Sequence, residues 1–272
     1  MGYGFDARLI AELLILGCAS GFLAGLLGVG GGMVMVPFMT FLLTAKGLPG
    51  QHVVKMAVAT SLATICFTSV SSVRAHQARG VVRWDIVRWL APGIIVGSLL
   101  GAQIARVLPS RVVAVLFALF VGFSATQMFL DRKPEPSRTL PQRVGMFAAG
   151  GVIGSLSALV GAGGAFLSVP FMIACNLPVH NAVGTSAALG FPIALAGSIG
   201  YVIAGWSLHD MPTGTLGYLY LPALLIIASA SVLTAPVGAR AAHSLDVKKL
   251  KRVFAGLLYS LAAYMLWHGI AG

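Results

Sequence analysis

Charged residues are scarce in this sequence of 272 residues. They make up 9% of it, whereas about 25% is usual for a soluble domain. Hydrophobic residues account for 58% and the mean hydropathy is +0.92. Apolar runs of roughly 20 residues recur, and each is long enough to cross ~30 Å of hydrocarbon as a helix. The lack of charge therefore excludes an ordinary soluble protein and predicts an all-α polytopic membrane protein.

Acidic residues are the scarcest charged class, and none lies in the middle of an apolar run. The seven carboxylates, which fall in predicted loops or near the ends of apolar segments, are Asp6, Glu12, Asp85, Asp131, Glu135, Asp210 and Asp246. A buried carboxylate relay for protons therefore has no candidate residue. Ser-His-Asp, HExxH and CxxC arrangements are also absent. We expect a protein that is not an enzyme.

Cysteine is rare as well, since only Cys18, Cys66 and Cys175 are present. All three lie in apolar segments without the spacing of metal ligands, so we interpret them as small packing residues. We expect neither a bound metal nor a cofactor. The net charge of +11 does not indicate nucleic acid, because the basic residues cluster in short loops between apolar runs, as cytoplasmic loops do. The expected surroundings are the lipid bilayer.

The sequence contains an internal repeat. Residues 28–38, GVGGGMVMVPF, align with residues 161–171, GAGGAFLSVPF. Residues 56–61, MAVATS, align with residues 181–186, NAVGTS. The chain therefore reads as two related membrane units.

A polar, proline-rich stretch at residues 131–143 separates the two units and is the predicted linker. Residues 1–130 form the first membrane repeat and residues 144–272 the second. Each repeat has five apolar segments. They run roughly over 9–27, 33–45, 53–73, 86–106 and 111–130, and over 144–160, 164–175, 181–203, 217–239 and 251–270. The second segment of each repeat is short for a membrane span, so it either crosses as a broken helix or re-enters.

The distribution of Lys and Arg favours ten crossings. With ten crossings, one side carries Arg74, Arg79, Arg83, Arg88, Arg132, Lys133, Arg138, Arg143, Arg240, Lys248, Lys249, Lys251 and Arg252, thirteen residues, and the other carries Arg8, Lys46, Lys55, Arg106 and Arg111, five residues. If the short segments re-enter instead, the same residues divide nine and nine. Because cytoplasmic loops are enriched in Lys and Arg, the linker is predicted to be cytoplasmic and both termini outside. Five crossings per repeat make the repeats inverted, which is typical of alternating-access transporters with a site near the midplane.

The two glycine-rich stretches predict breaks between helices. Non-helical backbone at membrane depth is tolerated only inside protein or along a cavity, and glycine lets a ligand approach the main chain. Each break exposes the N–H groups at the start of the next helix, a site suited to a small anion. A phosphate-binding P-loop is excluded because no Lys-Ser/Thr pair follows the glycines. The predicted anion-binding glycines are Gly30, Gly31, Gly32, Gly163 and Gly164.

Other glycines are better explained by close helix packing. Gly21 and Gly25, like Gly97 and Gly101, are four residues apart within apolar segments. This spacing brings two helices close together in a membrane.

Paired hydroxyl residues recur in the third segment of each repeat. Thr60 and Ser61 match Thr185 and Ser186. A single Ser or Thr in a helix often bonds back to its own carbonyls, but a pair at matched positions predicts substrate binding. Hydrogen bonds within the helix and substrate binding are both compatible with the sequence.

Lys55 occupies the same repeat position as His180. Both side chains could extend to the membrane surface from helix ends. Alternatively, Lys55, His180 and the adjacent Asn181 line the path of an anion.

The motifs resemble those of the TauE/SafE family of sulfite exporters. The resemblance rests on Gly28–Gly32 with Pro37, on Ala57–Ser61 and on Ala182–Ser186, and it covers nearly the whole chain. It implies movement of sulfite, sulfonates or related small sulfur-containing anions across the bacterial inner membrane, often outward. The combination is specific for the family but not for one substrate.

The sequence thus predicts two inverted repeats of five helical segments with glycine-rich breaks, which form a transporter of sulfite or an organosulfonate. A passive anion channel and a sensor or subunit that does not transport are the alternatives. Breaks in both halves favour alternating access over an open pore. Whether copies of the chain assemble is left open.

Overall fold

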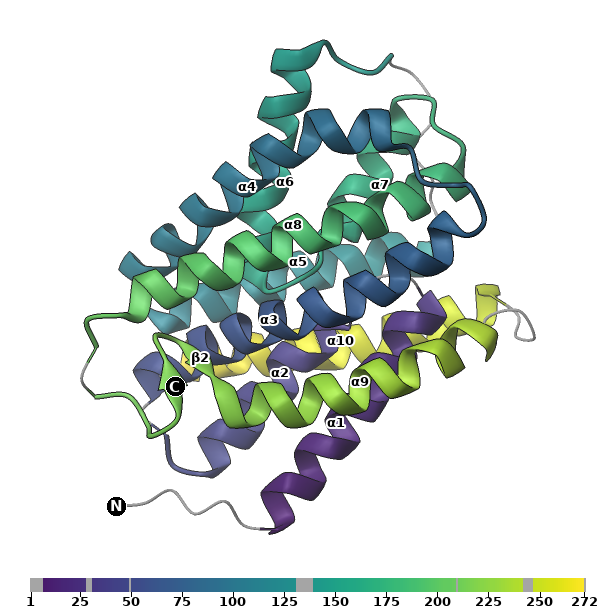
Figure 1. Cartoon of the computed structure of the whole chain (residues 1–272). Helices are drawn as coiled ribbons and strands as arrows, with labels where there is room; N and C mark the ends of the chain where they lie inside the picture. The colour runs from purple at the N-terminus through teal and green to yellow at the C-terminus, as the bar shows by residue number, and fades with distance from the viewer. Residues whose placement is uncertain are drawn as a thin grey trace.

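The computed structural model describes residues 7–27, 31–48, 50–130, 139–208, 210–241 and 247–271, and within these it forms ten α-helices and one pair of short β-strands (Figure 1). The first half contains α1 (Ala7–Leu27), α2 (Gly32–Ala45), α3 (Gly50–Gln77), α4 (Trp84–Val107) and α5 (Ser110–Leu130). The second half contains α6 (Arg143–Val160), α7 (Ala165–Ala174), α8 (Val179–Gly205), β1 (Thr215–Leu216), β2 (Leu219–Tyr220), α9 (Leu221–Ala241) and α10 (Val247–Ala271). Residues 131–138 of the predicted linker lie outside the described residues.

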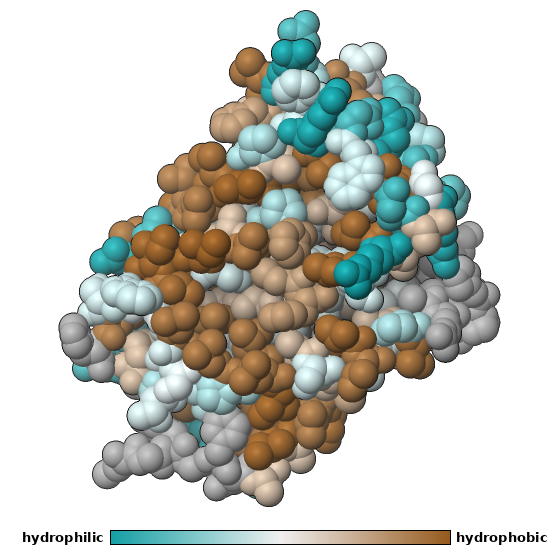
Figure 2. Space-filling view, viewed as in Figure 1, coloured by the Kyte–Doolittle hydropathy of each residue, from teal (hydrophilic) through white to brown (hydrophobic). Residues whose placement is uncertain are grey.

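Eight of the described helices are long and apolar enough to cross a membrane, which confirms the expected all-α polytopic fold. Large apolar side chains such as Ile15, Phe41 and Leu225 are exposed on the outside of the bundle. Figure 2 shows apolar side chains over much of the face in view, with polar residues gathered at the upper right. Helices α2 and α7 have only 14 and 10 residues. At 1.5 Å per residue, neither reaches across ~30 Å of hydrocarbon alone.

One boundary differs from the sequence prediction. The apolar segment expected over 217–239 becomes helical only at Leu221, because β1 and β2 first form an antiparallel hairpin. The hairpin turns at Gly217, which has φ +57°. A Cβ on Gly217 would lie 2.4 Å from the Val202 carbonyl oxygen, so only glycine allows the hairpin to pack on α8 here.

Glycines bring two pairs of helices close together, α1 against α9 and α6 against α4. A Cβ on Gly21 of α1 would lie 2.4 Å from the Ser231 carbonyl oxygen of α9, and a Cβ on Gly154 of α6 would lie 2.3 Å from that of Ile94 of α4. Gly97 of α4 meets α6 in the same way. Gly21 and Gly97 therefore have the packing role that their spacing predicts. In the order of the two halves, α1 matches α6 and α4 matches α9, so the same two positions pair in both contacts.

Helices α3 and α8 are the most buried of the eight spans and run antiparallel. The start of α3, at Lys55, and the end of α8, at Ala204, line one cavity. The start of α8 lies at the other end, where the Asn181 amide donates to the Val81 carbonyl, 3.1 Å away, in the turn after α3. The two central helices therefore begin at opposite ends of the bundle, and they carry all four predicted hydroxyl residues.

Candidate functional site

The glycine-rich stretch of the second half is a break between α6 and α7. Gly161 ends α6 with φ +71°, and Gly164 precedes α7 with φ +76°. These dihedrals are left-handed, so residues other than glycine are strained there. A Cβ on Gly164 would also lie 2.3 Å from the Ile193 side chain. Of the matching stretch, Gly30 lies outside the described residues, and Gly31 immediately precedes α2.

The two glycine-rich stretches meet each other. A Cβ on Gly32, the first residue of α2, would lie 2.3 Å from the carbonyl oxygen of Gly161 and 3.0 Å from the hydroxyl of Ser61. Ser61, on α3, donates a 3.0 Å hydrogen bond to that same carbonyl. The start of α2, the hydroxyl of α3 and the break before α7 thus converge.

A second group of hydroxyls lies beside the start of α7. Ser168 donates to the Gly164 carbonyl, 3.0 Å away, and its oxygen lies 2.7 Å from that of Ser186 on α8. A hydroxyl has one proton, so Ser186 is the donor to Ser168. The carbonyl oxygen of Gly163 also approaches α8, 3.6 Å from where a Cβ on Gly190 would lie.

Ser157 of α6 has a fully buried hydroxyl without a hydrogen-bond partner. Its oxygen lies 3.1 Å from the position of a Cβ on Gly164, the residue before α7. The first turn of any helix presents N–H groups with no partner inside the helix and a positive dipole end. An unsatisfied buried hydroxyl costs about 1–3 kcal/mol. A small acceptor with negative charge would satisfy both features at this point.

The two predicted threonines bond to backbone from the opposite half. Thr60 accepts the Tyr220 N–H at 3.1 Å, and Thr185 accepts the Arg83 N–H at 3.0 Å. Tyr220 directly precedes α9 and Arg83 directly precedes α4. Each threonine therefore fixes the segment that enters a helix of the other half. That Thr60 and Thr185 also bind an anion stays a prediction.

The predicted path residues lie at the two ends of the bundle. Lys55 is 5% exposed and donates a 3.0 Å hydrogen bond to the Arg106 carbonyl. A cation near the end of α4 is favourable because the helix C-terminus carries negative partial charge. His180 is exposed at the start of α8, beside Asn181. Neither basic side chain lies among the converging glycines.

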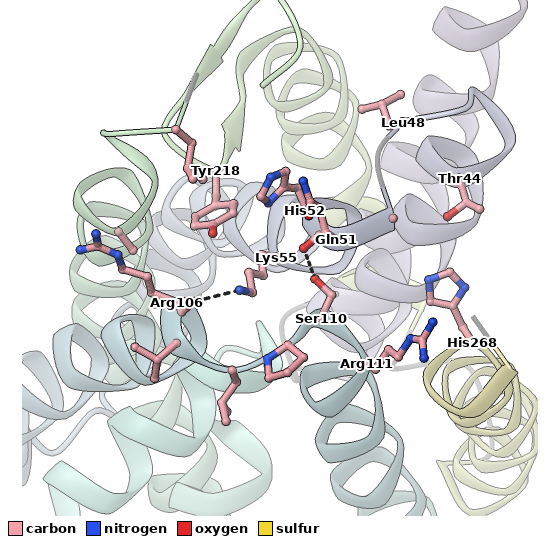
Figure 3. A pocket seen from close by; sticks show the side chains of 16 residues that line it. Thr44, Leu48, Gln51, His52, Lys55, Arg106, Ser110, Arg111, Tyr218 and His268 are labelled. Atoms are coloured by element: carbon pink, nitrogen blue, oxygen red, sulfur yellow. Dashed lines mark hydrogen bonds between the residues drawn. The ribbon is translucent and has the colours of Figure 1, made fainter. Parts of the chain in front are cut away.

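A cavity of about 840 Å³ opens around Lys55 (Figure 3). We call this cavity the vestibule, and its lining residues come from α2 to α5, α8, the loop before β1 and α10, with Tyr218 from the hairpin. The polar side chains labelled in Figure 3 are those of Thr44, Gln51, His52, Lys55, Arg106, Ser110, Arg111, Tyr218 and His268. Of these residues, only Lys55 was predicted from the sequence as a site residue.

Comparisons with known proteins give a consistent result. The family model "Sulfite exporter TauE/SafE" matches residues 13–265. A probable membrane transporter protein of Haemophilus influenzae is 36% identical over 253 residues, which cover 93% of this chain and 96% of the relative. One from Methanocaldococcus jannaschii is 26% identical, with 95% and 96% covered, and YunE of Bacillus subtilis is 30% identical, with 71% and 78% covered. No solved structure matches the chain.

Proposed function

Because the chain belongs to the TauE/SafE family of membrane transporters, we propose that it moves a small sulfur-containing anion, sulfite or an organosulfonate, out across the bacterial inner membrane. The transported anion binds where the two glycine-rich stretches meet. The relatives are named as transporters, and the chain is a transporter rather than an enzyme.

The observation that carries this proposal is the convergence of Gly32, Ser61 and Gly161 next to the start of α7. An anion there would receive N–H groups from the start of α7 and the hydroxyl proton of Ser157, which has no partner in the protein. These donors are neutral, so they suit a small anion that must also leave the site.

Two features support alternating access over a permanent channel. The first is the pair of antiparallel central helices, together with the matched helix pairs α1–α9 and α6–α4, which is the arrangement expected of inverted repeats. The second is the matched threonine contacts to Tyr220 and Arg83 at the two ends. Both contacts are present in this structure. Breaking one of them at a time would open the two ends of the bundle alternately.

The orientation that we propose places the linker in the cytoplasm and the vestibule outside. The described basic residues near the linker end include Arg74, Arg79 and Arg143, whereas only five Lys and Arg residues of the chain are predicted on the vestibule side.

We therefore predict opposite labelling of two exposed positions, Thr139 before α6 and Ser207 after α8. In a variant whose native cysteines are replaced by alanine, a membrane-impermeant maleimide added to intact spheroplasts should label Ser207→Cys and not Thr139→Cys. The reverse pattern would refute the orientation. Labelling after lysis serves as the control, since both cysteines should then react.

A binding screen tests the anion site directly. Sulfite, thiosulfate, sulfate and short sulfonates are titrated into purified protein, and we expect saturable binding of a sulfur-containing anion. Ser157→Ala should weaken the binding of the preferred anion by ~1.5–3 kcal/mol, the range for a hydrogen bond to a charged group. Ser260→Ala is the matched control, because the Ser260 hydroxyl is exposed and bonds within its own helix. Equal affinity of the two variants would remove Ser157 from the site.

A further inference from the structure

The vestibule has a strongly positive lining. Basic side chains reach it from α3 (His52 and Lys55), α4 (Arg106), α5 (Arg111) and α10 (His268), and no described lining residue is acidic. Asp210, in the loop before the hairpin, is the carboxylate that acts electrostatically on His52.

Tyr218 does not offset this positive charge. Burial raises the pKa of its phenol above the ordinary value of 10.0, although the nearby Arg106 opposes the shift. The phenol is therefore neutral at physiological pH. The Lys55 ammonium lies 5.7 Å from the centre of its ring, which is within the range of a cation–π contact.

Two groups in the vestibule have unused hydrogen-bonding capacity. The Lys55 ammonium has three donors, and one of them bonds the Arg106 carbonyl. The Nδ1 atom of His52, one turn earlier on α3, is buried without a partner. In Figure 3 the Lys55 ammonium extends between Arg106 on one side and Arg111 with His268 on the other.

The lining also includes apolar side chains. Leu48, Leu108, Pro109 and Leu208 contribute hydrocarbon surface beside the basic side chains. The volume of about 840 Å³ is in the range of sites for organic ligands, ~300–1,000 Å³. It is far more than an inorganic oxyanion with a few atoms fills.

We propose that the vestibule is a second ligand site, separate from the glycine convergence, and that it binds an organic anion with a sulfonate or carboxylate head and a short apolar tail. Lys55 and His52 bind the head, Arg111 supplies further positive charge, and the leucines cover the tail. A ligand that also carries an ammonium group binds more weakly, because Lys55, Arg106 and Arg111 repel it and Asp210 is not among the described lining residues.

The test uses two ligands of the same length, propane-1-sulfonate and 3-aminopropane-1-sulfonate, titrated by calorimetry into the full chain in neutral detergent. The wild type should bind the first at least about tenfold more tightly than the second. Lys55→Gln and Arg111→Gln should each lower the affinity for propane-1-sulfonate by about tenfold, the factor for ~1.4 kcal/mol. Arg111 is exposed on the first turn of α5, so its variant is informative even if Lys55→Gln does not fold.

Arg74→Gln is the matched charge control, because Arg74 is exposed at the far end of α3. It should keep wild-type affinity. Weaker sulfite binding in Ser157→Ala reports the glycine convergence, and weaker propane-1-sulfonate binding in Arg111→Gln reports the vestibule, so failure of one site is distinguishable from failure of the other.

Three results would overturn the proposal. They are equal binding of the two sulfonates, wild-type affinity in both Lys55→Gln and Arg111→Gln, and a vestibule filled only by lipid. The last is measured by adding phosphatidylglycerol to the micelles. If the lipid binds in an Arg111-dependent manner and propane-1-sulfonate does not bind at all, the site is a lipid site.

Discussion

Replacing Gly32 with alanine is expected to lower the affinity for the transported anion by roughly a hundredfold, about the loss of a strong hydrogen bond to a charged group. The added methyl would lie 2.3 Å from the Gly161 carbonyl oxygen and 3.0 Å from both the Ser61 hydroxyl and the end of Ile65. The carbonyl belongs to the backbone and cannot rotate away. The start of α2 must therefore move away from the break before α7, and the proposed anion site loses its shape.

Two variants control for the glycine change itself. Gly256→Ala adds a methyl to α10 where no atom lies within 4 Å, so it should not affect binding. Ala165→Gly removes the methyl at the repeat position that matches Gly32, and it tests whether the asymmetry of the two halves matters. Sulfite titration of folded Gly32→Ala is the measurement. Wild-type affinity would show that the meeting of the two stretches serves packing alone.

A large loss of stability is expected for Gly97→Ala on α4. Its methyl would lie 2.1 Å from the carbonyl oxygen of Gly151 and 2.8 Å from that residue's Cα on α6. Overpacking a well-packed contact costs about 1–3 kcal/mol, and more where backbone must move. Gly122→Ala on α5 has open space around the new methyl and should stabilise the helix by ~0.5–1 kcal/mol.

Thermal unfolding of the two variants in the same detergent, followed by tryptophan fluorescence, measures this difference. We expect a lower melting temperature for Gly97→Ala than for wild type, and one at or above wild type for Gly122→Ala. Equal melting temperatures would contradict the close approach of α4 and α6.

Much of the fold could be predicted because the bilayer leaves few choices. An apolar run in hydrocarbon must satisfy its backbone hydrogen bonds within itself, so the apolar segments mark the helices to within a few residues. The hairpin before α9 was missed because Tyr218 to Tyr220 lead directly into that helix without a charged residue. Its strands depend on Gly214 and Gly217 and on packing against α8, which hydropathy does not report.

The candidate site was predictable only where the chain repeats itself. Ser61 and Ser186 recur in both halves, and the structure places both beside the glycine breaks. Ser157 and Ser168 align with Ala24 and Met35, so a search for repeated residues passes over them. The vestibule had no local signal at all, because its basic residues come from four helices that are distant in sequence.

Initial rates of sulfite uptake into liposomes that contain the purified protein distinguish a carrier from a channel and from a protein that does not transport sulfite. For a carrier we expect the rate to saturate with sulfite concentration, and Ser157→Ala to raise the concentration for half-saturation by roughly tenfold or more. A rate that rises linearly would indicate a channel, and a rate equal to that of protein-free liposomes would indicate a protein that does not transport sulfite. Either result would contradict a carrier for sulfite with its site at the meeting point of the two glycine-rich stretches.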